Sequence, residues 1–197
     1  MRFSAIGDVA MTVPVVYSLA HDYPDVQITV LSRPYARPFF DNLAENINFM
    51  EADFNTEYKG IKGLNRLYRR LSAKRFTAIA DFHDIIRTKY LRTIFRASGY
   101  KVATINKHRK GKKQLTRKRN KKLIQQPTSF ENYADVLRRL GYPVTLDFQS
   151  IYQHMPTDQA ELNSLIGEKR EKWIGIAPFA LTGQKASTLC SYLLTMQ

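Results

Sequence analysis

The chain has 197 residues, 44% of them hydrophobic, and a formal net charge of +14, so it can form one full domain and part of another. Its single cysteine, Cys190, excludes a disulfide framework and fits a reducing cytoplasm, and no apolar stretch approaches the roughly 18–20 residues that a membrane span needs. Residues 1–20 contain an acid and a proline where the apolar core of a signal peptide would lie, so we expect a monomeric cytoplasmic protein, soluble or peripheral at the inner membrane.

Strand and helix patterns alternate over the first 145 residues, which predicts repeated β-α-β units and a largely parallel sheet. The first strand is a stub, Met1–Phe3, which we expect to be short or imperfectly paired. Later strands are expected at Gln27–Leu31, Asn48–Glu51, Phe76–Asp81 and Tyr100–Ile105. Helices are expected between them, at Met11–His21, Tyr35–Leu43, Ile61–Leu71 and Ile86–Ala97.

The last predicted helix of this region has clear boundaries. Thr128 or Ser129 can cap it, Glu131 completes a capping box with Thr128, and Gly141 ends it after Leu140. Farther along, the pattern predicts a helix at Gln159–Ile166, a charged linker at Gly167–Lys172 and a buried strand at Trp173–Pro178.

Most of the net charge comes from one segment, Lys101 to Lys122, which holds eleven Lys and Arg and no acidic residue. Such a segment is often a solvated loop. It also attracts phosphate groups, either on nucleic acid or on the anionic face of a membrane. The sequence leaves these readings open, although the segment lacks the aromatic side chains that stack on bases.

The first fourteen residues resemble a known family. Family-nine glycosyltransferases, the bacterial ADP-heptose:lipopolysaccharide heptosyltransferases, begin their first strand-to-helix turn with Arg-x-Ser-x-x-Gly-Asp-Val-x-x-Thr-x-Pro. Seven residues match that pattern over thirteen positions: Arg2, Ser4, Gly7, Asp8, Val9, Thr12 and Pro14. Members of the family have several more apolar residues before the position of Arg2.

The resemblance implies an α/β fold, with two Rossmann-like domains facing each other in the GT-B architecture. Residues 1–167 then form the acceptor-side domain, and residues 168–197 the linker and a fragment of the donor-binding domain. The family's donor-side pattern, Ala-x-x-x-Lys-x-Tyr-Pro, is absent after Ala180, so we expect a truncated second domain, a reading frame shifted from about Leu181, and little or no sugar transfer.

Asp8 is the strongest candidate for a catalytic residue. The resemblance implies that this carboxylate is a general base on the acceptor hydroxyl, in an inverting reaction that needs no metal. From the spacing alone, a plain helix N-cap is the favoured interpretation of Asp8, and the matched turn favours the catalytic one. Ser4 and Gly7 form the turn before it, where Gly7 permits a positive φ and helix amides can hold a phosphate, and Thr12 belongs to the same motif.

A second group of candidates follows the fourth strand. Asp81, Arg87 and Thr88 are similar to the family's acceptor-side turn, Asp-x-Gln-Gly-x-x-Arg/Lys-Ser, whereas His83 and Asp84 replace Gln-Gly. His83 reads equally as a loop residue that only forms hydrogen bonds, and the turn lacks further ligands for a metal site. The resemblance also implies acceptor binding by basic residues of the preceding helix, Arg66 and Arg70, which read equally as a solvated face.

The leading interpretation is a heptosyltransferase-like glycosyltransferase. It moves a sugar from a nucleotide-sugar, ADP-heptose-like, to a lipopolysaccharide-core or related glycolipid, and it needs no cofactor or specific nucleic acid. The alternative is a basic module that binds nucleic acid or an anionic membrane surface. A free-standing Rossmann-like nucleotide binder is disfavoured, because the Gly-x-Gly-x-x-Gly fingerprint is absent.

Overall fold

The computed structural model describes residues 1–151 and Ser164. The helix predicted at Gln159–Ile166, the linker at Gly167–Lys172, the strand at Trp173–Pro178, the boundary at residue 167 and the tail from Leu181 lie outside the described residues. No helix among the described residues is long and apolar enough to cross a membrane.

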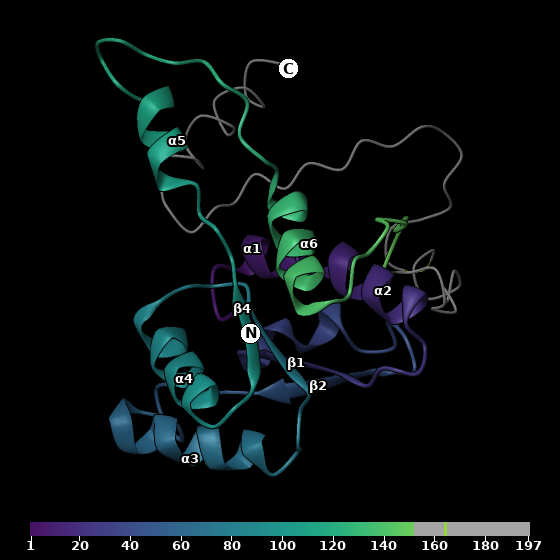
Figure 1. Ribbon diagram of the computed structural model, residues 1–197. Coiled ribbons are helices and arrows are strands. Elements are labelled where there is room, and N and C mark those ends of the chain that lie inside the picture. The colour runs from purple at the N-terminus through teal and green to yellow at the C-terminus, as the bar shows by residue number, and fades with distance from the viewer. Residues whose placement is uncertain (152–163, 165–197) are drawn as a thin grey trace. The chain divides into compact units, whose positions relative to one another are not determined.

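Two pairs of parallel strands form the framework (Figure 1). β1 (Ile28–Ser32) pairs with β2 (Ile47–Glu51), and β3 (Ala78–Asp81) pairs with β4 (Lys101–Thr104). The predicted parallel α/β fold is therefore confirmed.

The segment Met1–Phe3 joins the two pairs. The Arg2 N–H donates to the Leu31 carbonyl of β1 at 3.2 Å, and the Phe82 N–H, after β3, donates to the Met1 carbonyl at 3.1 Å. It is not assigned as a strand, as expected for a stub. The spatial order is therefore β2, β1, Met1–Phe3, β3, β4, which is the order of the first five strands of a Rossmann fold.

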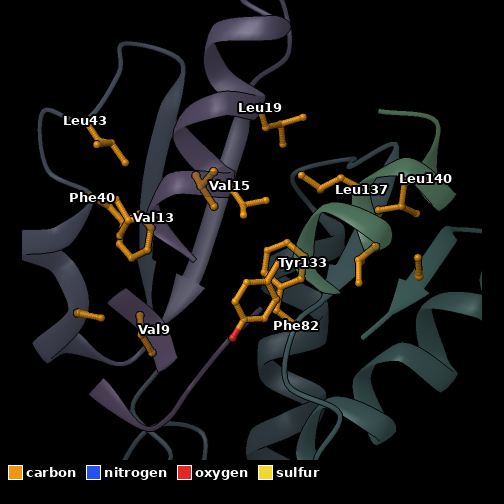
Figure 2. Close-up of a cluster of buried hydrophobic side chains, with 14 residues drawn as sticks. Val9, Val13, Val15, Leu19, Phe40, Leu43, Phe82, Tyr133, Leu137 and Leu140 are labelled. Atoms are coloured by element: carbon orange, nitrogen blue, oxygen red, sulfur yellow. The ribbon is translucent and has the colours of Figure 1, made fainter. Parts of the chain in front are cut away.

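Helices cover both faces of this framework (Figure 1). On one face lie α2 (Val13–Asp22) and α6 (Ser129–Leu140), and on the other α3 (Gly60–Ser72) and α4 (Ile86–Ala97). Side chains alternate along the strands, so Val30 packs toward α2 and α6, whereas Leu31 packs toward α3 and α4. Figure 2 shows the hydrophobic core on the face of α2 and α6, where Phe82 and Tyr133 pack against each other.

Three short helices differ from the sequence-based expectations. The helix expected to begin at Met11 is preceded by a separate turn of helix, α1 (Ile6–Ala10). The segment near Tyr35–Leu43 is a 3-10 helix, η1 (Pro34–Phe39), which contains Pro38. The basic segment, read as a loop, contains α5 (Arg109–Leu115).

A groove of about 680 Å³ continues the line of Met1–Phe3 between β1 and β3. Arg2 and Met1 close one end of it, and its walls include Thr29 and Ala78. The carbonyl of Leu31 accepts a hydrogen bond from Arg2, and the carbonyl of Ala80 accepts one from Met1. Because every second residue of a strand directs its peptide groups to the same side, those of Thr29 and Ala78 face the groove. The groove therefore has the width of one parallel strand, with backbone hydrogen-bonding groups on both sides.

We expect an added apolar strand to fill this groove. Placing Val-Ile-Val-Val directly before Met1 should raise the free energy of unfolding by about 2 kcal/mol, because the burial of four aliphatic side chains outweighs the cost of ordering them. Urea unfolding followed by circular dichroism measures the change. A Gly-Ser-Gly-Ser extension is the matched control, and equal stability of the two extended proteins would show that the groove does not accept a strand.

Candidate functional site

The candidate site lies where the strand order reverses, between Met1–Phe3 and β3. In open parallel sheets, ligands bind at such a point, outside the carboxyl ends of the strands. Two turns leave the sheet there, Ser4–Asp8 after the first segment and Phe82–Ile85 after β3. Each of the two motifs singled out in the sequence therefore contributes one turn to the same edge.

Asp8 occupies the third position of α1, and the N-cap residue is Ala5, so the reading of Asp8 as an N-cap is wrong. Its side chain is 48% exposed. Oδ2 forms an ion pair with the Arg2 guanidinium and accepts a bond from the Ala5 N–H at 3.4 Å. Both contacts use Oδ2, so the other carboxylate oxygen, Oδ1, has no hydrogen-bond partner among the described residues.

Arg2 ties the two turns together. Its guanidinium also donates to the Phe82 carbonyl at 2.8 Å, so one side chain connects Asp8 to the end of β3. The side chain is mostly buried, which restricts it to this bridging position. Arg2 was recognised as part of a motif, but its sequence position gave no sign that it orients the carboxylate.

The side chain of His83, in the turn after β3, reaches the segment Phe3–Ser4 and is neutral. Burial, followed by the positive charges of Arg2 and Lys107, lowers the pKa of His83 to about 4. The Phe3 N–H lies 3.3 Å from Nδ1, and Ser4 Oγ lies 3.3 Å from Nε2. Nδ1 therefore accepts, Nε2 carries the proton and donates to Ser4 Oγ, and the Ser4 hydroxyl proton stays available for a ligand.

Asp81 is fully buried and is held by hydrogen bonds from within the protein. Oδ1 accepts from the N–H groups of His83 (2.9 Å) and Asp84 (3.1 Å), and Oδ2 accepts from Arg92 (3.0 Å) and Thr104 (3.2 Å). Burial alone would raise the pKa of Asp81, but the backbone hydrogen bonds from His83 and Asp84 together with the nearby N-terminal charge and Thr88 outweigh it and lower that pKa. These hydrogen bonds give Asp81 a supporting position in the turn after β3, and its predicted substrate contact stays a prediction.

Thr88 and Thr12 are buried in the same way. Thr88 Oγ1 accepts from the Ile85 N–H at 3.0 Å and caps α4, and Thr12 Oγ1 donates to the Val9 carbonyl at 2.7 Å. Neither presents surface to a substrate. Their hydrogen bonds fix the start of α4 and the junction between α1 and α2, and their role in substrate binding stays a prediction.

Gly7 and Arg87 face solvent at the site. Gly7 is helical, within α1, so the expected positive φ is not found, and a Cβ added there would meet no atom within 4 Å. Arg87 is exposed in the first turn of α4, and its guanidinium lies 5.3 Å from the centre of the Phe54 ring. Phe54 in turn packs on Phe3, which places Arg87 beside the turn that follows Met1–Phe3.

Arg66 and Arg70 are not brought to this edge. Both are exposed on α3, and Arg70 is held by the Tyr58 hydroxyl at 2.6 Å and by Glu57 at 3.6 Å. Arg70 lines a cavity of about 410 Å³ whose other lining residues include Asn48 of β2. No described contact connects either arginine to Asp8.

Asp84 and Arg92 are site residues whose roles the sequence did not reveal. Asp84 has a φ of 49°, in the left-handed region that favours glycine, and it stands where the similar family pattern has glycine. Arg92 Nη1 lies 2.8 Å from Asp84 and 3.0 Å from Asp81. Lys107 donates to the Asp84 carbonyl at 2.9 Å, and burial lowers the pKa of this lysine.

Exposed apolar side chains surround the turns. Ile86 is 85% exposed at the start of α4, and Ile6 and Tyr35 are also exposed at the carboxyl edge of the sheet. Across residues 1–151, no group of three or more His, Cys, Asp and Glu side chains could hold a metal ion. The site therefore offers a carboxylate oxygen, a serine hydroxyl and an exposed arginine, bordered by aliphatic surface.

The strand order and the helices on both faces define a Rossmann-like α/β domain. A solved structure titled as a glycosyl transferase of family 9 from Veillonella parvula DSM 2008 is similar, with a TM-score of 0.54 and 18% sequence identity. The match covers 98% of this chain and 58% of that one, so the chain spans less than two thirds of that protein. No family model and no curated protein matches the chain.

Proposed function

We propose that this chain carries the acceptor side of an inverting glycosyltransferase of the heptosyltransferase type, acting in the cytoplasm on a lipopolysaccharide-core or related glycolipid. The observation that carries the proposal is Asp8, a half-exposed carboxylate held by Arg2 at the point where the strand order reverses. The similar fold of a family 9 glycosyl transferase and the left-handed φ of Asp84 support it.

In the proposed reaction, an acceptor hydroxyl binds Oδ1 of Asp8. The hydroxyl oxygen attacks the anomeric carbon of a nucleotide-sugar from the side opposite the leaving group, and the bond from that carbon to the nucleoside diphosphate breaks. Asp8 takes the hydroxyl proton as the new bond forms. Arg2 fixes the carboxylate through Oδ2 and leaves Oδ1 in position to accept, which favours reaction by orientation.

Arg87 and Ser4 are the proposed acceptor-binding groups beside Asp8. Arg87 is exposed and can bind a phosphate or carboxylate through two parallel hydrogen bonds. Ser4 can donate its hydroxyl proton, since His83 supplies the bond that Ser4 Oγ accepts. An acidic, hydroxyl-rich glycan matches these groups.

Binding of a deacylated, phosphorylated lipopolysaccharide-core oligosaccharide tests the proposal, because this ligand forms no bilayer. By calorimetric titration, Arg87→Ala should weaken binding about tenfold, since it removes a charge-assisted contact. Arg66→Ala is the matched control, because Arg66 is an exposed arginine without a described link to the site. No binding, or equal losses in both variants, would contradict the acceptor site.

Asp8→Asn separates binding from chemistry. The amide keeps the shape of the carboxylate, so we expect oligosaccharide affinity to change less than about threefold. Any sugar transfer that the protein supports should fall at least about 100-fold, the range seen when a general base is lost. Transfer that survives Asp8→Asn unchanged would contradict the role of Asp8 as the base.

A further inference from the structure

The segment between β4 and α6 projects away from the strands and the other described helices (Figure 1). We name residues 108–124 the basic arm. It contains nine Lys and Arg residues and no acid, and all nine side chains are exposed. Arg109, which lies 3.7 Å from Asp84, is the one basic residue of the arm with an ion pair in the part of the chain that the structure describes.

The arm is folded back on itself. The Lys122 N–H donates to the Gln114 carbonyl at 3.2 Å, which ties the returning limb to α5. The Gln126 side chain, just after the arm, also lies against α5, since a Cβ on Gly111 would be 2.0 Å from its Oε1. The nine positive charges are therefore concentrated on one small hairpin, and α5 buries none of its residues.

Two aliphatic side chains accompany these charges. Leu123 is 80% exposed and Ile124 is 59% exposed, directly after Lys121 and Lys122. The exposure of two neighbouring aliphatic side chains to water is unfavourable, so a partner that covers them gains binding free energy. Lysines and arginines beside exposed aliphatic groups are typical of segments that lie in the headgroup region of an anionic bilayer.

The same composition argues against nucleic acid as the partner. Proteins that bind single strands combine positive charge with aromatic side chains on which bases stack. Residues 108–124 contain no Phe, Tyr or Trp. A bilayer uses both the charges and the aliphatic pair, whereas a nucleic acid would use only the charges.

We propose that the basic arm docks the protein on an anionic phospholipid bilayer, with its lysines and arginines on headgroup phosphates and Leu123 and Ile124 inserted beneath them. The docking is separate from the proposed transferase activity and does not depend on it. The arm leaves the sheet beside Asp84, since Lys107 and Arg109 both contact that residue. Docking would therefore bring the edge that carries Asp8 and His83 toward the membrane surface.

Sedimentation with vesicles tests the docking. We expect the protein to bind vesicles with about 30% phosphatidylglycerol in phosphatidylcholine at least about tenfold more tightly than pure phosphatidylcholine, in about 0.1 M NaCl. Raising NaCl to about 0.5 M should weaken binding to the anionic vesicles severalfold, because added salt screens the attraction. Equal binding to both vesicles would overturn the proposal.

A matched pair of charge reversals locates the site. The double variant Lys118→Glu with Lys121→Glu should bind the anionic vesicles at least about tenfold more weakly. Lys62→Glu with Lys89→Glu changes the net charge equally on α3 and α4, so it should stay within about threefold of the parent. All four lysines are exposed, and circular dichroism checks that both variants fold. Equal losses in the two variants would show that net charge alone, without the arm, governs binding.

The aliphatic pair distinguishes a bilayer from other polyanions. Leu123→Ser with Ile124→Ser should weaken vesicle binding about fivefold, and the loss should persist in high salt because it is not electrostatic. Binding of a 30-nucleotide single-stranded RNA should be unaffected by this variant and weaker than vesicle binding in the same buffer. Vesicle binding that is equally tight in the double serine variant and the parent, or tighter binding to the RNA than to vesicles, would overturn the proposal.

Discussion

Replacing Asp81 with alanine should lower the free energy of unfolding by about 3–5 kcal/mol, the largest effect that we expect from one side chain. The carboxylate is fully buried and accepts hydrogen bonds from two backbone N–H groups, Arg92 and Thr104. Its removal leaves those donors without their acceptor and leaves most of the positive charge of Arg92 buried beside Asp84 alone. Urea unfolding at pH 7, followed by circular dichroism, measures the loss.

Two further variants separate this cause from the loss of any ion pair. Adding Arg92→Met to Asp81→Ala should recover about 2 kcal/mol, because it removes a mostly buried positive charge that has lost one of its two carboxylate partners. Asp135→Ala breaks contacts to Arg138 and Arg139 on an exposed face of α6, and it should cost less than about 1 kcal/mol. A loss below about 1 kcal/mol for Asp81→Ala would show that the carboxylate does not organise the turn after β3.

The elements that could be predicted from the sequence are those specified by neighbouring residues. α4 has the predicted boundaries, Ile86–Ala97. Both ends of α6 were also predictable, because Thr128 and Glu131 form a capping box at its start and Gly141 adopts a φ of 97° at its end. Local hydrogen bonds and backbone preferences decide such boundaries, so a pattern of a few residues is enough.

α1 and α5 could not be predicted in this way. α1 has five residues, its N-cap residue Ala5 has no polar side chain, and it precedes a helix whose second residue is Pro14, so the sequence favours a turn there. α5 contains Gly111 and buries no side chain, so it has no apolar stripe to reveal a helix. The returning segment is tied to α5 by the hydrogen bond from the Lys122 N–H to the Gln114 carbonyl, a contact that no periodic pattern records.

The candidate site was predictable in position but not in the roles of its residues. Strand ends placed Asp8 and His83 on one edge, and the structure brings them together through Arg2, Phe3 and Ser4. The motifs placed both Asp8 and Asp81 among the residues that contact substrate, yet Asp81 is fully buried and the side chain of Asp8 is half exposed. Burial depends on packing between segments far apart in the chain, so a motif cannot separate a supporting residue from one that faces solvent.

Acidification should destabilise the protein through His83. The folded protein keeps the pKa of His83 at about 4, because burial and the nearby charges of Arg2 and Lys107 disfavour the protonated ring, whereas an unfolded chain has a histidine pKa of about 6.5. Between these two values the unfolded state binds a proton that the folded state does not. The stabilisation is therefore complete above about pH 6.5, declines as the pH falls, and is lost near pH 4. The loss of stability between pH 7.5 and 4.5 is about 2.5 kcal/mol.

His83→Gln isolates this contribution, since glutamine offers a donor and an acceptor but does not titrate. Urea unfolding of both proteins between pH 7.5 and 4.5 should show the free energy of the variant falling about 2.5 kcal/mol less than that of the parent. His21→Gln is the matched control, because it makes the same replacement at a largely exposed histidine of α2. A parallel profile for His83→Gln would mean that the ring takes up its proton equally well in the folded protein, and that the neutral tautomer assigned beside Ser4 is wrong.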